Sequence, residues 1–201
     1  MVVTASSTLE QKLYKEGVLL VAGIDEVGRG ALAGPLVAGC VILPLDHRLG
    51  LADSKLISAK KRTSIAEQIR SSAVGFGLGW VSNTEIDEFG LAWCLQEAYL
   101  RALENMHLEV SHIILDGSVD YLKEFEICQT MVKADQKVNC VAAASILAKV
   151  ARDNYMQSLC EQYPEYCYDT NVGYGTKAHR EALSKHGLTD IHRKSFCRQF
   201  K

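Results

Sequence analysis

The chain has 201 residues, of which 48% are hydrophobic and 23% are charged, and its formal net charge is −2 at pH 7. This size and composition predict one domain over residues 1–201. Within it we expect a lead-in over 1–17, before the first apolar run, and a helical, basic segment over about 160–201. The longest uncharged run, 31–45, is interrupted by glycine and proline, which excludes a membrane span of ~20 apolar residues.

The N-terminal segment and the cysteines indicate the compartment. No apolar stretch followed by a small-residue cleavage site stands near the N-terminus, so we expect a cytoplasmic protein without a secretory signal. The seven cysteines are scattered and include no C-x-x-C pair, which argues against a disulfide framework and against a zinc knuckle. We therefore expect reduced thiols.

The charges are segregated along the chain. The segment 85–126 carries ten acidic and two basic residues, whereas 177–201 carries seven lysines and arginines and two acidic residues. A basic C-terminal segment suits contacts with phosphates. The charge alone also fits a solvated helical face, so it supports a nucleic-acid surface only when functional motifs accompany it.

In chain order, the first predicted elements are strands. The apolar run 18–24 ends in Asp-Glu-Val-Gly, and the run 36–43 is rich in branched residues between two prolines, so both predict buried strands. Ser58 can cap a helix whose apolar residues lie one turn apart. The segment 74–82 alternates large residues with glycines, which predicts a third strand.

A long amphipathic helix follows. Thr84 with Asp87 three residues later resembles a capping box, and apolar residues over 91–106 recur at helical spacing. The run 112–115 predicts a strand that leads directly into Asp116 and a glycine, which permits a sharp turn.

The remaining chain predicts a strand over 127–132, a helix over 138–152 whose small residues allow close packing, and helical, polar structure after Pro164. Strands and helices thus mix along the whole chain, without an internal repeat or a linker. This organisation predicts an α/β layered domain.

Acidic residues stand at the ends of several predicted elements. Asp25 and Glu26 follow the first strand, Asp116 follows a later strand, and Asp135 precedes a helix. Strand ends over a packed sheet hold side chains rigidly and leave them accessible, and oxygen-rich clusters select Mg²⁺ or Mn²⁺ over zinc. A single acid is usually a surface charge or a helix cap, so the set, rather than any member, predicts a metal site.

Consecutive residues of a strand point to opposite faces, so Asp25 and Glu26 cannot both enter one site from ideal strand geometry. We therefore expect Glu26 to lie where the strand is already turning, which Gly28 and Gly30 make possible because glycine tolerates positive φ. Arg29 stands between these glycines, where a nucleic-acid backbone can approach the peptide groups closely.

The segment 28–33 also fits the loose dinucleotide-binding pattern, and Asp53 follows it by about 20 residues. That pattern must open a helix that holds a pyrophosphate, whereas Pro35 and the branched run after it predict a strand. A nicotinamide-binding domain is therefore the weaker alternative.

The octapeptide 23–30, Gly-Ile-Asp-Glu-Val-Gly-Arg-Gly, resembles the N-terminal signature of bacterial ribonuclease HII, the type 2 ribonuclease H family. Four further segments resemble that family in the same order: 53–55, 116–117, 133–153 and 173–176. Each fragment alone is weak, but five in order make the resemblance specific.

This resemblance implies a ribonuclease H-like fold, with a central mixed β-sheet flanked by helices and a helical C-terminal extension. It implies an endoribonuclease that hydrolyses the RNA strand of RNA–DNA hybrids and cuts on the 5′ side of ribonucleotides embedded in duplex DNA. The products would carry 5′-phosphate and 3′-hydroxyl ends, and two Mn²⁺ or Mg²⁺ ions would serve as cofactors. We expect a monomer with no organic cofactor and no membrane partner, which acts in ribonucleotide removal from DNA and in primer RNA degradation.

By the same resemblance, the catalytic and metal-binding residues are Asp25, Glu26, Asp116 and Asp135, and Asp25 would bridge the ions. Clustered carboxylates repel one another, so some of them should hold protons more tightly without metal. We therefore expect activity to rise toward neutral or alkaline pH.

The resemblance also assigns Gly28, Arg29, Gly30 and Tyr174 to recognition of the 2′-hydroxyl at a ribonucleotide-to-deoxyribonucleotide junction. A 2′-hydroxyl both donates and accepts hydrogen bonds, so backbone groups near glycines can detect it. Tyr174 adds an aromatic face and a hydroxyl group.

Further candidates for substrate contacts are Lys55, Ser145, Lys177 and His179. A lone lysine in a loop is usually solvated, and His179 fits a helix surface equally well. Ser145 is equally suited to close packing.

Two positions depart from the family pattern. Ala134 stands before Asp135 where glycine is expected, and we expect this change to be harmless because the backbone there need not adopt positive φ. The motif that begins at Asp53 continues with Leu-Ile-Ser where a further lysine is common, so one phosphate contact can be missing.

Two alternatives remain. Ribonuclease HIII resembles this chain but carries an extra N-terminal domain and a glutamate as the last acid, which here is Asp135. A non-catalytic hybrid-binding module would need only the basic surface and the loop 28–30. The complete acid set argues against such a module, because acids repel phosphates unless metals are present.

Overall fold

The computed structural model of the protein describes residues 5–51 and 57–200. Its strands are β1 (Val21–Val27), β2 (Leu36–Ile42), β3 (Gly75–Val81), β4 (His112–Asp116) and β5 (Cys128–Met131). Within the described ranges they form a five-stranded sheet in the order β3-β2-β1-β4-β5. β1 runs antiparallel to β2 and parallel to β4, so the predicted mixed sheet is confirmed.

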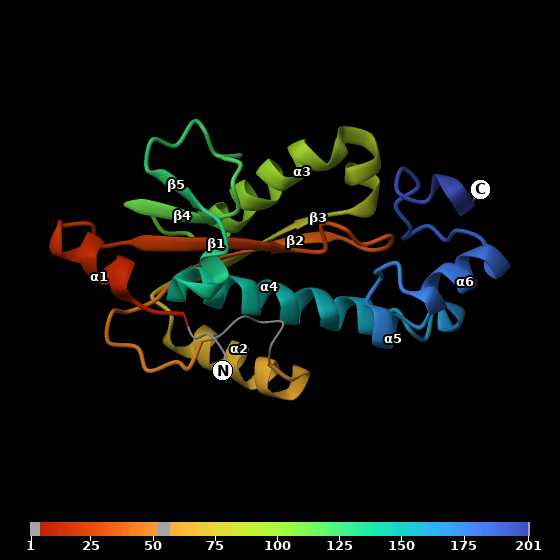
Figure 1. Ribbon diagram of the computed structural model, residues 1–201, viewed down its shortest axis with the longest axis horizontal. Coiled ribbons are helices and arrows are strands. Elements are labelled where there is room, and N and C mark those ends of the chain that lie inside the picture. The colour runs from red at the N-terminus through yellow and green to blue at the C-terminus, as the bar shows by residue number, and fades with distance from the viewer. Residues whose placement is uncertain (1–4, 52–56, 201) are drawn as a thin grey trace.

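Helices cover both faces of this sheet (Figure 1). α3 (Asn83–Glu104) lies on one face, whereas α4 (Asn139–Ser158) lies on the other and α2 (Ala59–Ser72) packs against α4. The other helical segments are α1 (Thr8–Lys15), η1 (Ala134–Gln136), η2 (Pro164–Tyr166), α5 (Tyr168–Asn171), α6 (Lys177–His186) and η3 (Arg198–Phe200). The predicted α/β layers are therefore confirmed.

Glycines let the two large helices approach the sheet closely. A Cβ added to Gly39 of β2 would lie 2.4 Å from the carbonyl oxygen of Ala144 in α4. On the opposite face, a Cβ at Gly79 of β3 would lie 1.9 Å from the carbonyl oxygen of Ala98 in α3. These distances leave no room for any side chain, so the alternating glycines of β3 serve helix packing.

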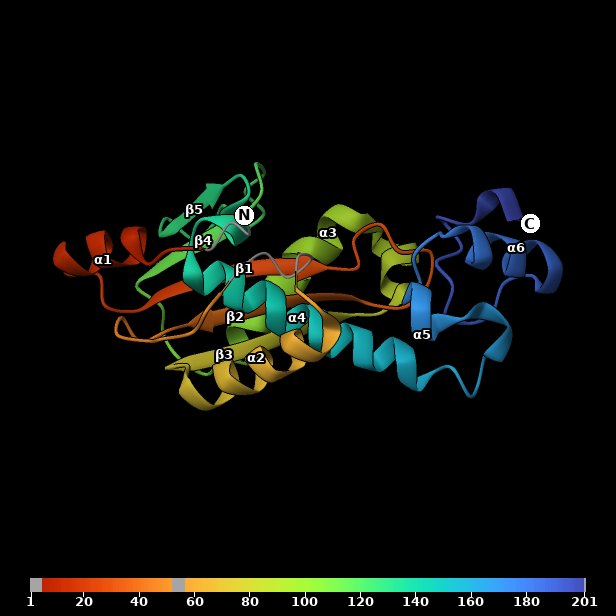
Figure 2. The ribbon, with the colours of Figure 1, turned by 60° about the horizontal axis from the view of Figure 1, so that its bottom comes forward.

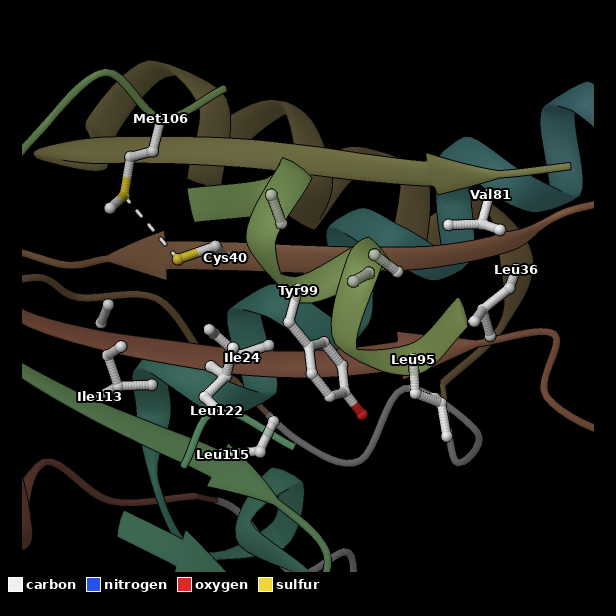
Figure 3. Close-up of a cluster of buried hydrophobic side chains, with 14 of the residues drawn as sticks. Ile24, Leu36, Cys40, Val81, Leu95, Tyr99, Met106, Ile113, Leu115 and Leu122 are labelled. Carbon is white, nitrogen blue, oxygen red and sulfur yellow. Dashed lines mark hydrogen bonds between the residues drawn. The ribbon is translucent and has the colours of Figure 1, made fainter. Parts of the chain in front are cut away.

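The core between α3 and the sheet is closely packed (Figure 3). Ile24 of β1, Leu115 of β4 and Leu95 of α3 are completely buried there. Burial of a side chain of this size stabilises the fold by about 1.5–3 kcal/mol. Tyr99 lies in the same core with its ring buried, and its hydroxyl reaches beyond the apolar residues.

The predicted capping box of α3 is wrong by two residues. The hydroxyl of Ser82, not Thr84, accepts from the Glu85 N–H at 3.2 Å, and Glu85 accepts from the Ser82 N–H at 2.8 Å. Asp87 instead accepts hydrogen bonds from the N–H groups of Lys194 and Ser195. The sequence pattern assigned Asp87 to the helix cap, but in the folded protein Asp87 is hydrogen-bonded to the C-terminal segment instead.

The C-terminal segment extends beyond the carboxyl end of β1, where α5 and α6 lie (Figures 1 and 2). It consists of short helices joined by irregular chain, so it is less helical than predicted. Isolated bridges join Ala31 to Tyr174 and Ala33 to His192, and they attach this segment to the loop after β1. None of the described helices is long and apolar enough to span a membrane.

Candidate active site

β1 places Asp25 and Glu26 on opposite faces of the sheet. The ladder with β2 continues to Val27, so the expectation that Glu26 lies where the strand is already turning is wrong. Asp25 is directed toward α4, where the Ser145 side chain hydrogen-bonds its carboxylate. Glu26 is directed toward α3, where its Oε2 accepts a 2.6 Å hydrogen bond from the Tyr99 hydroxyl. Pairing with β2 from Gly23 to Val27 keeps the strand extended through both acids.

The parallel register of β1 and β4 brings another acid to Asp25. The ladder ends one pair before Asp25 and Asp116, so these residues lie side by side at its carboxyl end. Oδ1 of Asp116 accepts a 2.6 Å hydrogen bond from the Ala134 N–H. This bond holds η1 against the end of β4 and brings the buried Asp135 to the same region.

The acids act on one another electrostatically. Burial raises the pKa of Asp25 well above its usual range, and the charge of Glu26 raises it further. Asp116 and Asp135 act in the same direction. Burial also raises the pKa of Glu26, although its hydrogen bond and the Arg29 guanidinium oppose this effect. The four residues therefore share one neighbourhood, which we call the acidic cluster (Asp25, Glu26, Asp116 and Asp135).

The donors of the acidic cluster fit a hard divalent cation, because Mg²⁺ and Mn²⁺ prefer carboxylate oxygens. Among the described residues, however, no three His, Cys, Asp or Glu side chains already form a group that could hold an ion. Glu26 and Asp116 are bonded to donors of the protein instead.

The loop of Gly28, Arg29 and Gly30 meets Tyr174 across 146 residues of sequence. The Gly28 N–H donates a 3.1 Å hydrogen bond to the Tyr174 hydroxyl. Gly28 has a φ of 91°, and a Cβ there would lie 2.3 Å from Nε of Arg152. Both the backbone conformation and the lack of space require glycine at this position. The structure thus brings the predicted loop and Tyr174 together, and their contact with a 2′-hydroxyl remains a prediction.

Arg29 and Gly30 face the surface. The Arg29 side chain is 56% exposed, and its Nη1 lies 3.8 Å from Oε1 of Glu26. A Cβ at Gly30 would meet no atom within 4 Å. The loop therefore connects the acidic cluster with open surface that a nucleic-acid backbone can reach.

Arg152 is a buried residue of the site that the sequence did not single out. It is fully buried in α4, and its guanidinium donates to the carbonyl oxygens of Pro35 (2.8 Å), Val172 (2.8 Å) and Ala33 (3.0 Å). Its Cζ lies 5.3 Å from the centre of the Tyr174 ring. Arg152 thus joins the loop after β1 to the Tyr174 turn. The sequence did contain a signal for this role, because Arg152 is an arginine on a face of α4 whose other residues are small and apolar.

Arg193 supports the same loop from the C-terminal segment. It is fully buried and donates to the carbonyl oxygens of Gly34 (3.0 Å) and Arg29 (3.1 Å). Burial lowers its pKa to about 9, and the charge of Arg152 lowers it further. The planar guanidinium can serve several carbonyls at once, which an ammonium group cannot do with the same geometry. Arg193 is one of the seven basic residues counted in the C-terminal segment, but it is fully buried and so does not add to the positive charge at the surface.

The further predicted substrate contacts have different outcomes. Ser145 is buried and bonded to Asp25, and the exposed Lys177 lies 3.8 Å from Glu181. His179 is fully buried, so the prediction that it contacts a phosphate directly is wrong for this arrangement. The reason is that α6 turns its ring inward, toward the C-terminal segment. Lys55 lies outside the described residues, as does the rest of the motif 53–55.

The alanine before the last acid is accommodated without strain. Ala134 lies in η1 and its φ is not positive, whereas the preceding Lys133 adopts the left-handed conformation with a φ of 57°. The backbone does not need glycine at position 134, as expected. The loop 28–35 leads into β2 rather than into a helix, so the dinucleotide-binding alternative lacks its phosphate-binding helix.

Comparison with known proteins decides the family. A family model described as Ribonuclease HII matches residues 22–199 of the chain. The chain belongs to the ribonuclease HII family. It is 43% identical to Ribonuclease HII of Shouchella clausii over 189 residues, which cover 93% of this chain and 72% of that protein. It is 44% identical to Ribonuclease HII of Staphylococcus carnosus over 195 residues, with 93% and 74% covered.

Solved structures share the fold of this ribonuclease HII family member. The ribonuclease H2 from Pyrococcus horikoshii has a TM-score of 0.77 with 27% identity, and the match covers 90% of this chain and 97% of that chain. A PCNA:RNase HII complex from Archaeoglobus fulgidus matches with a TM-score of 0.76 and 28% identity, covering 89% and 94%. The predicted ribonuclease H-like fold is confirmed.

Membership in the ribonuclease HII family makes the protein a ribonuclease H, a hydrolase of the RNA in RNA–DNA hybrids. The enzyme class predicted from the sequence is therefore confirmed. A ribonuclease HIII structure shares the fold, with a TM-score of 0.67 and 21% identity. The family model and the curated relatives are of type HII, which assigns this chain to HII rather than to HIII.

Proposed function

We propose that this ribonuclease H is a divalent-metal-dependent endonuclease that hydrolyses the RNA strand of hybrids and also cuts on the 5′ side of ribonucleotides embedded in duplex DNA. The observation that carries the proposal is the position of the acidic cluster immediately before the Gly28 loop, which contacts Tyr174. The groups that we propose for phosphodiester hydrolysis and those that we propose for recognition of a 2′-hydroxyl thus lie next to one another, near the carboxyl end of β1.

The acidic cluster would hold two Mn²⁺ or Mg²⁺ ions, and Asp25 is the best placed to bridge them. It lies between Glu26, which follows it in β1, and Asp116, which lies beside it in β4. A ribonuclease HIII that shares this fold is described in complex with Mn²⁺. Paired ions, when bound, activate the attacking water and neutralise the leaving oxygen.

The protein groups around the cluster orient its carboxylates. Ser145 holds Asp25 from α4, and Tyr99 holds Glu26 from α3. The two helices pack on opposite faces of the sheet, so the acids that meet at its end are each supported by a different layer. Rigid support of this kind keeps metal ligands near their productive geometry.

Recognition of the ribonucleotide falls to the Gly28 loop and Tyr174. The Tyr174 hydroxyl accepts from the Gly28 N–H, so its own proton remains available for a substrate oxygen. A 2′-hydroxyl can accept that proton, and the open surface at Gly30 leaves room for the sugar. Arg29 in the Gly28 loop and Lys177 at the start of α6, three residues after Tyr174, are exposed cations and would contact phosphates.

The products would carry 5′-phosphate and 3′-hydroxyl ends, and the substrates would be RNA–DNA hybrids and ribonucleotide-containing duplex DNA. Such an activity suits ribonucleotide removal from DNA and the degradation of primer RNA in the cytoplasm. We further propose a single catalytic domain that works as a monomer without an organic cofactor.

The test is cleavage of duplex DNA that carries one embedded ribonucleotide, with Mg²⁺, with Mn²⁺ and with chelator. The parent should cut on the 5′ side of the ribonucleotide only with metal, and Asp25→Asn should abolish cutting without weakening binding of the duplex. Asp169→Asn, which changes an exposed acid of α5, is the matched control. Tight binding without cutting under every metal would overturn the proposal in favour of a hybrid-binding module.

A further inference from the structure

Two histidines are buried side by side behind the Tyr174 turn. His179 belongs to α6 and His192 to the segment that follows it, and both are fully buried. Their Nε2 atoms lie 3.1 Å apart. The rings of Tyr166 and Tyr168 enclose the pair, and the Tyr168 hydroxyl lies 3.2 Å from Nε2 of His192.

The backbone partners of the two rings determine where their protons lie. Nδ1 of His179 is 3.0 Å from the carbonyl oxygen of Tyr174, which can only accept, so this nitrogen carries a proton. Nδ1 of His192 is 2.9 Å from the Thr189 N–H, which can only donate, so this nitrogen carries none. In the neutral pair, Nε2 of His192 then carries the proton and faces the bare Nε2 of His179 at 3.1 Å, with the Tyr168 hydroxyl oxygen as a second acceptor at 3.2 Å.

The hydrogen bonds therefore all point the same way: Thr189 donates to His192, His192 to His179, and His179 to the carbonyl oxygen of Tyr174. The hydroxyl of Tyr174 in turn accepts from the Gly28 N–H. The chain of bonds thus ends at the loop that follows the acidic cluster. Its centre, the two histidines, is buried away from water, where a hydrogen bond is strong and an unpaired group is costly, whereas Thr189 and Tyr174 at its ends are half-buried.

We propose that His179 and His192 are positioning residues which, as a neutral hydrogen-bonded pair, hold the Tyr174 turn against the Gly28 loop. The proposal rests on the proposed function in one respect, namely that this turn binds the ribonucleotide. It assigns a task to His179, which is too deeply buried to contact substrate itself.

An additional proton would break a hydrogen bond of the pair. A second proton on His179 would lie at Nε2, directed at Nε2–H of His192. A second proton on His192 would lie at Nδ1, where the Thr189 N–H at 2.9 Å loses its acceptor, even though the Thr189 hydroxyl oxygen lies 2.8 Å away. Either event replaces an attraction with a repulsion and breaks one bond of the chain. Burial lowers the pKa of His192 to about 4 and also lowers the pKa of His179, so the pair stays neutral near pH 7.

Burial lowers the pKa values of the two histidines, and the titratable and charged groups around them oppose that lowering only weakly. Tyr166 of η2 and Tyr168 of α5 face the rings, and burial raises the pKa of both phenols, which keeps them uncharged. The charge of Asp190 raises the pKa of His192, but it contributes less than burial does. The Arg193 guanidinium is bonded to carbonyls of Gly34 and Arg29 rather than to the rings.

The first experiment assigns the protons in the parent protein by nuclear magnetic resonance with ¹⁵N-labelled histidine. The expected result is a proton on Nδ1 of His179 and on Nε2 of His192, both retained from pH 7.5 to pH 5.5. A proton on Nε2 of His179, or a ring that titrates near its usual pKa, would overturn the inference. This measurement needs no substrate, so it stands even if the proposed cleavage activity fails.

The second experiment separates positioning from stability. His179→Asn keeps an amide N–H near the place of Nδ1–H, whereas His179→Leu removes the donor to Tyr174. We expect KM for the single-ribonucleotide duplex to rise about fivefold in the leucine variant, the effect of one lost hydrogen bond, with kcat little changed. The asparagine variant should keep KM within about twofold of the parent, because it keeps that bond.

The control is His186→Asn, which alters the exposed histidine of the same helix and should leave KM unchanged. Thermal unfolding of all variants is recorded in parallel. If the leucine and asparagine variants lose stability equally and both keep the KM of the parent, the histidines are packing residues and the inference is overturned. If the parent does not cut beside a ribonucleotide, the proposed function fails, and the proton assignment alone then decides on the pair.

Discussion

The hydroxyl of Tyr99 donates a 2.6 Å hydrogen bond to Oε2 of Glu26 and thereby ties the acidic cluster to the hydrophobic core. The Tyr99 ring is buried among residues of α3 and the sheet (Figure 3). Burial and the charge of Glu26 raise the pKa of this phenol, so it stays a donor at neutral pH. The orientation of one predicted metal ligand therefore depends on a residue of the core.

Tyr99→Phe should test this dependence. The ring remains in the core, so the free energy of unfolding should fall only by about 1–3 kcal/mol, the cost of the donor that the largely buried Glu26 loses. We expect the Mn²⁺ concentration for half-maximal cleavage to rise about tenfold, in the range for residues that orient metal ligands. Tyr121→Phe is the matched control, because its ring packs against Tyr99. An unchanged Mn²⁺ dependence would show that Glu26 does not need this bond.

Asp25→Asn should stabilise the protein in chelator while it abolishes cleavage. The change removes one buried charge from among like charges that raise the pKa of Asp25, and an amide oxygen can still accept from the Glu26 N–H. The free energy of unfolding, measured with urea, should rise by about 1 kcal/mol.

With metal, the parent should become more stable than the Asp25→Asn variant, the reverse of their order in chelator. An ion that binds only the folded parent stabilises it by about 2.7 kcal/mol at one hundred times its dissociation constant, whereas the asparagine variant should gain much less. The check is urea unfolding with and without Mn²⁺. Equal stabilisation of both proteins would mean that Asp25 is not a ligand.

Gly28→Ala should displace the loop. The added Cβ would lie 2.3 Å from Nε of Arg152 in a backbone with a φ of 91°, so both contact and conformation are unfavourable. We expect the rate of cleavage beside a ribonucleotide to fall about a hundredfold, the effect of moving a binding group by ~1 Å. Gly50→Ala, where a Cβ meets nothing within 4 Å, should leave the rate unchanged.

Arg152→Met should destabilise the fold through the carbonyls that it leaves unpaired. The side chain donates to carbonyl oxygens of Pro35, Val172 and Ala33. We expect the free energy of unfolding to fall by about 3 kcal/mol, as befits several buried acceptors without partners. Arg180→Met, at an exposed site of α6, is the matched control and should change it by less than about 0.5 kcal/mol.

The buried histidine pair predicts how stability depends on pH. Burial lowers the pKa of His192 from 6.5 to about 4, so between these values the unfolded chain binds the proton that the folded protein excludes. Stability from this residue is fully present above pH 6.5 and is lost as pH falls toward 4, by at most about 1.4 kcal/mol per pH unit. His192→Gln should flatten this slope relative to the parent. An identical slope in both proteins would contradict the lowered pKa.

Local patterns in the sequence predicted the strands that carry the acids. The apolar runs 18–24 and 112–115 overlap the observed β1 and β4, which extend further and include Asp25, Glu26 and Asp116, and the small residues after Asp135 lie in the observed α4. Apolar patterning works here because both strands lie inside the sheet, where neighbouring strands and helices bury most of their residues. The order of the short motifs was sufficient to indicate the family.

The same local signals did not determine which face each acid uses or what holds it. Ser82 with Glu85 and Thr84 with Asp87 are both acceptable caps by sequence, and contact of Asp87 with the C-terminal segment decided between them. Likewise, the turn expected at Glu26 did not form, because pairing with β2 keeps β1 extended to its end.

The sequence by itself determined the layers, the Gly28 loop and the position of each acid near the end of an element, because these follow from hydrophobic patterning and from residues that are neighbours in the chain. Only the tertiary structure decided the roles of Tyr99, Arg152 and His192. The partners of these side chains lie 73, 117 and 13 residues away in the sequence, so packing rather than local pattern brings them together. A buried donor must find an acceptor wherever the fold supplies one, and that requirement is absent from any local stretch of sequence.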